Sequence, residues 1–141
     1  EDKTVLGDLA AKLCRPTRWK GRRVRALNPL SVEDASLLEA VNRGEFTIQG
    51  LRNRDLRAVL YGPEPTDKQE LRRQSAAVTR KLRLLRAHGL IHKVSKSHRY
   101  QVSSSGRKAI TALLSARAAD IAKLTSAARK ICAGEQEFRR L

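Results

Sequence analysis

Cysteine, aromatic residues and long apolar runs are all scarce in this chain of 141 residues. Its two cysteines, Cys14 and Cys132, lie near opposite ends of the sequence and lack the spacing of metal ligands. We therefore expect reduced thiols, as in a cytoplasmic protein, with neither a disulfide nor a zinc site. The five aromatic side chains predict an aliphatic core. Because no apolar run approaches the ~20 residues of a membrane span and no signal peptide opens the chain, we expect no membrane partner.

The residues that catalysis needs are not arranged in any convincing set. His88 and His92 are four residues apart, but Gly89 interrupts the helix that would align them as metal ligands. The acidic residues lack a nuclease-like spacing, and the sequence has no phosphate-binding glycine loop. We therefore expect no enzyme activity, no metal site and no cofactor in this chain.

Acidic residues are few, and they are segregated from a large excess of basic ones. The chain has 30 Lys and Arg against 14 Asp and Glu, which gives a net charge of +16. Residues 71–119 contain twelve basic residues and no acidic one, and residues 9–32 contain seven basic residues and no acidic one. Such a charge is easier to tolerate beside a polyanion, and its segregation predicts a basic surface next to a neutral or acidic one.

Apolar residues at helical spacing predict a mostly helical chain. Helices are expected at residues 1–13, 32–42, 53–61, 69–88 and 106–133. Ser31 and Asn53 suit the N-cap positions of the second and third of these helices. Residues 46–51, which lie between those two helices, form a short apolar connection that can add a brief strand.

Residues 69–88 predict the central element, a long basic helix with two different faces. Its buried face carries Leu71, Ser75, Val78, Leu82 and Leu85. At about 100° per residue, the opposite face combines arginines with alanines. This face consists of Gln69, Arg73, Ala76, Arg80, Arg83 and Ala87, flanked by Arg72, Ala77 and Thr79. Small residues between guanidinium groups let a helix approach a nucleic acid closely, whereas the alternative is a solvated basic face without a ligand.

A short two-stranded hairpin is predicted directly after this helix. Gly89 stands where a helix end favours a left-handed residue. The helical period ends there, and Leu90, Ile91 and Val94 lead to a turn near Lys96 and Ser97. Residues 99–102 then run back as a second short strand with alternating character. The helix is therefore expected to be followed by a wing.

Residues 15–25 are predicted to form an extended basic arm before the first of the central helices. The segment contains six basic residues, with Pro16 and Gly21 as breakers of regular structure. Two interpretations remain open. The arm can track phosphates or enter a groove, with Trp19 stacking on a base, or it is a charged linker whose Trp19 docks on the domain surface.

The last predicted helix carries an apolar stripe. The stripe alternates spacings of four and three, close to a coiled-coil seam except at Arg117. Its members are Ile110, Leu114, Arg117, Ile121, Leu124, Ala128 and Ile131. Its early turns can pack on the core while later turns protrude. The stripe fits a dimerisation arm or an intramolecular partner such as the first helix.

Residues 82–110, LRLLRAHGLIHKVSKSHRYQVSSSGRKAI, resemble the winged helix-turn-helix domain of MarR-like transcription regulators. In that family a recognition helix ends in a Leu-x-x-x-Gly-Leu-Ile turn, a wing hairpin follows, and a Thr or Ser near a Gly starts the next helix. The matching positions are Leu85, Gly89, Leu90, Ile91, Tyr100, Val102, Ser104 and Gly106. The chain departs from the pattern in its short wing and in the basic arm that replaces an N-terminal dimerisation helix.

A second resemblance concerns the origin of the chain. The segment LLEAVNRGEFTIQGLRNRDLRAVLY is similar to the C-terminal part of longer, poorly characterised bacterial proteins. The chain begins at Glu1 without a methionine, so we expect it to be a piece of such a protein. Three segments are predicted, with an N-terminal helix and arm at 1–30, a winged helix-turn-helix domain at 31–105 and a packing or dimerisation helix at 106–141.

The MarR-like resemblance implies that the helix of residues 69–88 lies in a DNA major groove, braced by the helix of residues 53–61. The implied major-groove and phosphate contacts are Arg72, Arg73, Thr79, Arg80 and Arg83. The wing would contribute Lys93, Lys96, His98 and Arg99. The arm would contribute Arg18, Lys20, Arg22, Arg23 and Arg25.

The expected function is therefore binding of double-stranded DNA, as a transcription regulator or as the DNA-docking domain of a larger protein. One alternative is binding of RNA or of structured single strands, because winged helices also occur in RNA-binding proteins. Another is a protein-interaction or assembly module that uses the C-terminal helix, as a homodimer or within a larger parent protein.

Overall fold

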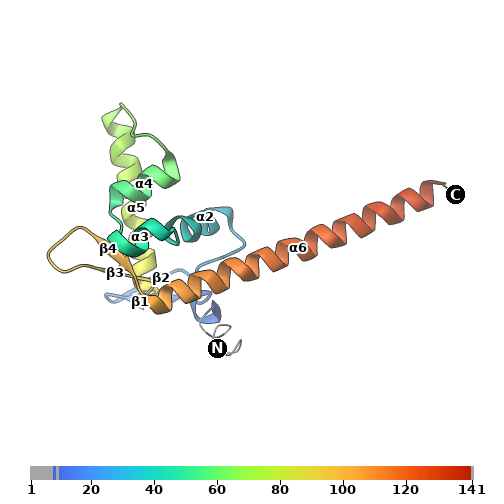
Figure 1. The fold of residues 1–141 in the computed structure, drawn as a ribbon, viewed down its shortest axis with the longest axis horizontal. Helices are drawn as coiled ribbons and strands as arrows, with labels where there is room; N and C mark the ends of the chain where they lie inside the picture. The colour runs from blue at the N-terminus through green and yellow to red at the C-terminus, as the bar shows by residue number, and fades with distance from the viewer. Residues whose placement is uncertain (1–7, 9, 141) are drawn as a thin grey trace.

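A computed structural model describes residue 8 and residues 10–140, the last ten of these by their backbone path only. The described residues are mainly helical, with two small antiparallel sheets of two strands each and a long C-terminal helix (Figure 1). The elements are β1 (Thr17–Trp19), β2 (Arg22–Val24), α2 (Val32–Val41), α3 (Gly44–Gln49), α4 (Asn53–Tyr61), α5 (Lys68–Ala87), β3 (Ile91–Lys93), β4 (Tyr100–Val102) and α6 (Ser104–Arg140). Residues 10–13 are also helical, whereas most of the helix predicted at 1–13 lies outside the described residues.

Local signals in the sequence determine the ends of α2 and α5. The Ser31 hydroxyl accepts a hydrogen bond from the Asp34 N–H at 3.4 Å, as predicted for an N-cap. The Asp67 carboxylate caps α5 in the same way, accepting from the Gln69 N–H at 3.0 Å. At the other end of α5, Gly89 has φ +73°, so the chain turns out of the helix where predicted.

The connection predicted at residues 46–51 is wrong in its main part. Residues Gly44–Gln49 form the helix α3, because the buried Phe46 anchors a helical turn in the core. The predicted strand is reduced to one bridge, in which Leu51 and Tyr100 exchange two backbone hydrogen bonds of 2.8 Å. This bridge fastens the start of α4 to β4.

Gly50 allows the chain to pass from α3 into this bridge. Its φ is +72°, and a Cβ atom at this position would lie 2.7 Å from the Tyr100 carbonyl oxygen. Gly50→Ala should therefore lower the free energy of unfolding by about 1 to 3 kcal/mol, measured by urea denaturation. Gly44→Ala is the matched control, because a Cβ at Gly44 meets nothing within 4 Å. An equal stability of the two variants would contradict the strain at Gly50.

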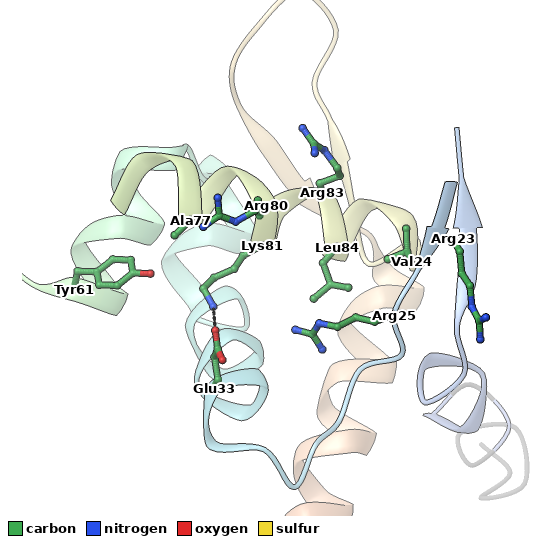
Figure 2. A pocket seen from close by; sticks show the side chains of 10 residues that line it. All are labelled: Arg23, Val24, Arg25, Glu33, Tyr61, Ala77, Arg80, Lys81, Arg83 and Leu84. Carbon is green, nitrogen blue, oxygen red and sulfur yellow. Dashed lines mark hydrogen bonds and ion pairs between the residues drawn. The ribbon is translucent and has the colours of Figure 1, made fainter. Parts of the chain in front are cut away.

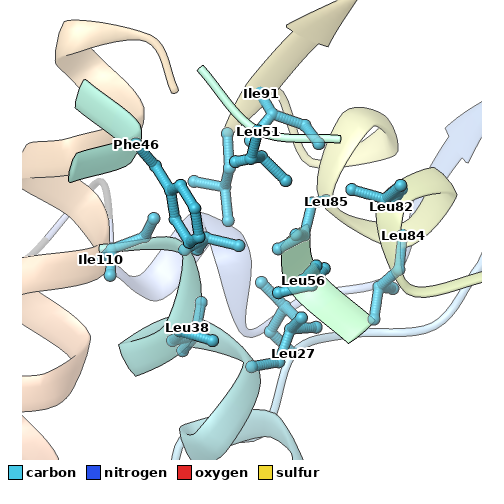
Figure 3. Close-up of a cluster of buried hydrophobic side chains, with 14 of the residues drawn as sticks. Leu27, Leu38, Phe46, Leu51, Leu56, Leu82, Leu84, Leu85, Ile91 and Ile110 are labelled. Atoms are coloured by element: carbon cyan, nitrogen blue, oxygen red, sulfur yellow. The ribbon is translucent and has the colours of Figure 1, made fainter. Parts of the chain in front are cut away.

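A single aliphatic core joins elements from the whole described chain. Its fully buried members include Leu38 from α2, Leu56 from α4, Leu85 from α5 and Ile110 from α6 (Figure 3). The predicted inner face of α5 is confirmed, since Val78, Leu82 and Leu85 are buried. Leu84, which was not placed on that face, is also buried at 7% exposure. Leu13 and Leu27 belong to the same cluster, so the N-terminal segment packs on the domain.

The predicted extended arm is instead a β-hairpin. Strands β1 and β2 pair antiparallel, with Thr17 opposite Val24 and Trp19 opposite Arg22. The two-residue loop has φ +51° at Lys20 and +76° at Gly21, the left-handed pair that favours tight hairpins. Pro16 therefore directly precedes the hairpin and Gly21 forms part of its turn, so neither residue prevents regular structure here.

Helix α6 packs at its start and projects away from the domain later (Figure 1). Ser103 caps it by accepting from the Gly106 N–H at 3.0 Å, and Ile110 and Leu113 are buried against the core. Arg117 interrupts the apolar stripe because its guanidinium donates to the carbonyls of residues 29 and 30, both at 3.2 Å. Farther along, Ile121 and Leu124 are 42% and 68% exposed. Intramolecular packing thus explains the apolar residues in the early turns of α6. Dimerisation through the later turns stays a prediction.

Candidate nucleic-acid interface

The solvent-facing side of α5 carries the predicted arginines. Arg72, Arg73, Arg80 and Arg83 are all exposed, as is the intervening Ala76. Arg73 lies 3.6 Å from the Glu70 carboxylate, in an exposed pair on the same helix. For the other three arginines, the described part of the chain places no carboxylate within ion-pair distance. The helix therefore presents guanidinium groups that are available to an external anion.

Thr79, predicted to contact DNA, has a structural role in joining α4 to α5. Its hydroxyl donates to the Ser75 carbonyl at 2.9 Å and accepts from the Asn53 side-chain amide at 3.1 Å. Asn53 was predicted to cap α4, but Arg52 occupies the N-cap position. The backbone N–H of Arg52 donates to the Asp55 carboxylate at 2.9 Å. The Asn53 side chain instead forms hydrogen bonds with α5, and these bonds connect the start of α4 to α5.

A groove of about 390 Å³ runs along one side of α5 (Figure 2). Arg80 and Arg83 line it from α5, and Arg23 lines it from β2, so the structure brings together predicted residues that are almost 60 positions apart. Lys81 also lines the groove, but its ammonium group is 2.7 Å from the Glu33 carboxylate. Lys81 therefore ties α5 to α2. Arg25 also lines the groove but is paired with Asp34, so Arg23, Arg80 and Arg83 are the groove cations without an ion pair to any described residue.

The N-terminal hairpin docks against the end of α5 through Trp19. The Arg86 guanidinium lies 4.9 Å from the centre of the Trp19 ring, and the Lys20 ammonium group lies 4.5 Å from it. Arg86 is also 5.8 Å from the Tyr100 ring of the wing, so it contacts both hairpins. Of the two interpretations of Trp19, docking on the domain surface is the one that the structure shows. Nucleic-acid contacts by the exposed Arg18, Lys20, Arg22 and Arg23 stay a prediction.

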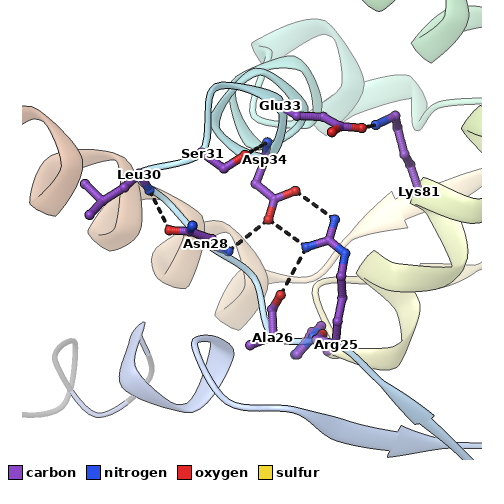
Figure 4. Close-up of polar contacts among 9 residues, drawn as sticks. Arg25, Ala26, Asn28, Leu30, Ser31, Glu33, Asp34 and Lys81 are labelled. Atoms are coloured by element: carbon purple, nitrogen blue, oxygen red, sulfur yellow. Dashed lines mark hydrogen bonds and ion pairs between the residues drawn. The ribbon is translucent and has the colours of Figure 1, made fainter.

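Arg25 differs from the other hairpin residues because it is held in a bidentate pair. Its two terminal nitrogens donate to the Asp34 carboxylate at 2.9 Å each, and the Asn28 N–H donates to the same carboxylate at 2.9 Å (Figure 4). Burial alone would raise the pKa of Asp34, but these hydrogen bonds outweigh burial and hold that pKa below its ordinary value. Arg25 thus fastens the hairpin to α2, a structural role that the predicted nucleic-acid contact did not include.

The hairpin of β3 and β4, which was predicted as a wing, places its predicted residues on the surface beside α5. Lys93, Lys96, His98 and Arg99 are exposed, and Lys96 takes a left-handed conformation in the turn with φ +60°. The wing is anchored to the core through Ile91, whereas its tip extends beyond the domain (Figure 1). The basic groups of this hairpin are therefore exposed on an element that is anchored to the core.

Sequence reasoning missed a group of basic residues on α4 and its N-cap. Arg52, Arg54 and Arg57 line a second groove, together with the predicted His98. The segment RNRDLR carried a signal, because Arg54 and Arg57 are three residues apart and share one face of a helix. Their convergence with the wing depends on the bridge between Leu51 and Tyr100, which no local pattern indicates.

The described residues show neither a cluster of metal ligands nor a helix suited to a membrane. They contain no group of three or more His, Cys, Asp or Glu side chains that could hold a metal ion. None of their helices combines the length and apolarity that a membrane crossing requires. The chain was also compared with protein families, curated proteins and solved structures. No family model matches it, and neither a curated protein nor a solved structure gave a match.

Proposed function

We propose that this chain is a winged helix-turn-helix module that binds double-stranded DNA. The order of elements supports this proposal, since α2, the Leu51 bridge, α4, α5 and the β3–β4 hairpin follow one another as in that fold. In this arrangement α5 is the recognition helix, α4 braces it, and the hairpin of β3 and β4 is the wing. The MarR-like resemblance of residues 82–110 points to the same assignment.

The observation that carries the proposal is the outward face of α5. At a rise of about 1.5 Å per residue, Arg72 and Arg83 are separated by about 16 Å along the helix axis. A major groove about 12 Å wide admits an α-helix, so this face can contact both base edges and the flanking phosphates. Alanine at position 76 keeps the face narrow between its arginines. Arginine is also the side chain best suited to guanine and phosphate, through its planar fork of donors.

The surrounding surface supports contact with a long polyanion rather than with a small anion. Exposed cations continue from α5 onto the wing and onto the N-terminal hairpin, which both lie against Arg86. Of the acidic side chains near α5, Glu33 is paired with Lys81, and Glu70 lies 3.6 Å from Arg73 in an exposed pair that solvent screens. Such a surface favours binding through counterion release from DNA. A role as regulator or as the docking domain of a larger protein fits equally, and the exposed Ile121 and Leu124 of α6 offer the contact for a second copy or parent protein.

The test is Arg80→Gln combined with Arg83→Gln. We expect this double variant to weaken binding of a labelled 20-base-pair duplex by roughly 30-fold or more in fluorescence anisotropy, because each of the two lost contacts is worth about 1 to 3 kcal/mol. Both side chains are exposed, so the melting temperature should change little.

The matched control is Lys123→Gln combined with Arg129→Gln. It removes the same number of positive charges from the exposed part of α6, away from the proposed interface. Equal affinities of the two double variants for the duplex would contradict the assignment of α5 as recognition helix. Single-stranded DNA and a hairpin RNA of equal length are titrated in parallel, and tighter binding of either would replace duplex DNA as the proposed partner.

A further inference from the structure

We infer that the second groove, which lies on the other side of α5, is a binding site for a phosphate group. It has a volume of about 400 Å³ and lies between the start of α4, the middle of α5 and the strand β4. Arg52, Arg54, Arg57 and His98 line it, and no acidic residue does. The phosphate could belong to a DNA backbone or to a free phosphate group, since both present the same oxygens. For the DNA backbone, the inference rests on the proposed function.

Arg52 is the residue that points most directly to an anion. Its Nε atom is buried, with no hydrogen-bond partner among the described residues. A buried donor of a charged group that lacks a partner is unfavourable, and native structures satisfy nearly all such groups. The described residues also place no carboxylate within ion-pair distance of the Arg52 guanidinium. An oxyanion in the groove would supply the opposite charge that this guanidinium lacks. Because the Nε atom is closed to solvent, the contact would be made by the terminal nitrogens of Arg52.

The neighbouring cations differ in how far they are already neutralised. Arg54 is exposed at the rim of the groove and has no ion pair within the described part of the chain. Arg57 is more enclosed, with a side chain 16% exposed and a guanidinium 3.8 Å from the Glu64 carboxylate. Because Glu64 is 68% exposed, solvent screens this pair. Arg52 and Arg54 are therefore the main ligands, with Arg57 and His98 adding positive potential.

The groove is held in shape before any ligand arrives. The Asn53 amide donates to the Ser75 carbonyl at 3.0 Å, which fixes the start of α4 against α5. The two hydrogen bonds between Leu51 and Tyr100 fix the same point against β4. Preorganised donors lose little entropy on binding. Two guanidinium forks suit the several oxygens of a tetrahedral phosphate better than the two oxygens of a carboxylate.

The place of the groove on α5 agrees with a duplex lying on this helix. Ser75, Thr79 and Leu82 line it, whereas Ala77, Lys81 and Leu84 line the first groove. At 100° per residue these two sets lie roughly opposite one another, with the exposed arginine face between them. A duplex whose major groove receives that face has a phosphate backbone on each side of the helix. The second groove is thus placed to receive one of the two backbones.

The first experiment uses inorganic phosphate alone. The Nε–Hε signals of the arginines are followed by ¹H–¹⁵N NMR on the full chain while phosphate replaces chloride at constant ionic strength. We expect a saturable shift of the Arg52 signal, which Arg52→Lys assigns by removing it while keeping the charge. An Arg52 signal that does not move, or that moves equally with chloride, would overturn the site. This readout is independent of DNA binding, so it separates the groove from the proposed function.

The second experiment identifies the source of the phosphate. Arg52→Gln combined with Arg54→Gln should weaken duplex binding about tenfold, as expected for lost hydrogen bonds to a charged group, and should reduce the slope of log affinity against log salt by about 1 to 2. The control is again Lys123→Gln with Arg129→Gln, and melting temperatures verify folding. Phosphate shifts without a loss of duplex affinity would support a free phosphate as the ligand. Duplex binding that is unchanged by the variant, with no phosphate shift, would reject the groove and leave the proposed function standing.

Discussion

Leu85→Ala should lower the free energy of unfolding by about 2 to 5 kcal/mol. Leu85 is fully buried on the inner side of α5, where Figure 3 shows it between Leu56 and Leu51. Removing three carbon atoms there loses apolar burial and leaves a cavity that the closely packed helices cannot fully close. The measurement is urea denaturation followed by circular dichroism, with the slope of the transition checked for two-state behaviour.

Leu124→Ala is the matched control for this variant. It makes the same chemical change in a helix, but at a position that is 68% exposed on the projecting part of α6. We expect its effect to stay within about 0.5 kcal/mol. Equal stability of the two variants would contradict the burial of Leu85 in the core. Since Leu85 lies on the face opposite the arginines, the proposed DNA binding should be unaffected by Leu85→Ala at temperatures where the variant is folded.

Helix α5 and the hairpin of β3 and β4 could be predicted from the sequence because their signals are local. Val78, Leu82 and Leu85 recur at helical spacing, and Gly89 follows at the point where the helix must end. The change from helical to alternating periodicity then indicates the strands. The exposure of Arg80 and Arg83 follows from the same geometry, since they lie opposite the buried face. Those inferences need only the repeat of the helix.

The parts that sequence reasoning missed depend on contacts between distant residues. Residues 46–51 contain too few apolar positions to show a period, so the helix α3 was mistaken for a connection. The hairpin formed by β1 and β2 is only three residues long on each side, and its tight turn is made by Lys20 and Gly21 rather than by the usual Asn and Gly. The groove around Arg52 requires His98 of the wing, 46 positions away. Such pairings appear only when the chain has folded.

Arg25 belongs to the same class of missed roles, and its pair with Asp34 makes the fold sensitive to acid. The folded-state pKa of Asp34 is lowered, although burial opposes this, because Arg25 and the Asn28 N–H donate to the carboxylate. An acid with a lowered folded-state pKa stabilises the fold above its unfolded pKa of about 3.9, and that contribution is lost as the pH falls through the folded-state pKa. The contribution of Asp34 should therefore be constant above about pH 5 and should decline below about pH 4.

Arg25→Ala should lower the free energy of unfolding at pH 7 by about 2 to 3 kcal/mol. The variant removes the guanidinium partner of the Asp34 carboxylate, a side chain that is only 4% exposed in the unmodified protein, so the pKa of Asp34 should rise. Solvent screening limits the effect, because the Arg25 side chain is itself 57% exposed. Since protonation removes the unpaired charge, the stability difference from the unmodified chain should narrow as the pH falls below about 4. Urea denaturation at pH 7 and at lower pH measures this difference.

Asp34→Asn in the Arg25→Ala background separates the loss of the pair from the burial of an unpaired charge. The asparagine fills the same space without a charge, so the double variant should be more stable at pH 7 than Arg25→Ala alone. The part of the pH dependence that comes from Asp34 should be absent from it. Arg23→Ala controls for the loss of a hairpin arginine, because Arg23 is exposed and has no ion pair in the described residues. A double variant no more stable than Arg25→Ala would contradict an unpaired buried carboxylate.

The pair of Arg25 and Asp34 also fastens the hairpin that carries Trp19 to the domain. Arg25→Ala should therefore weaken the contact between Trp19 and Arg86, which tryptophan fluorescence reports directly.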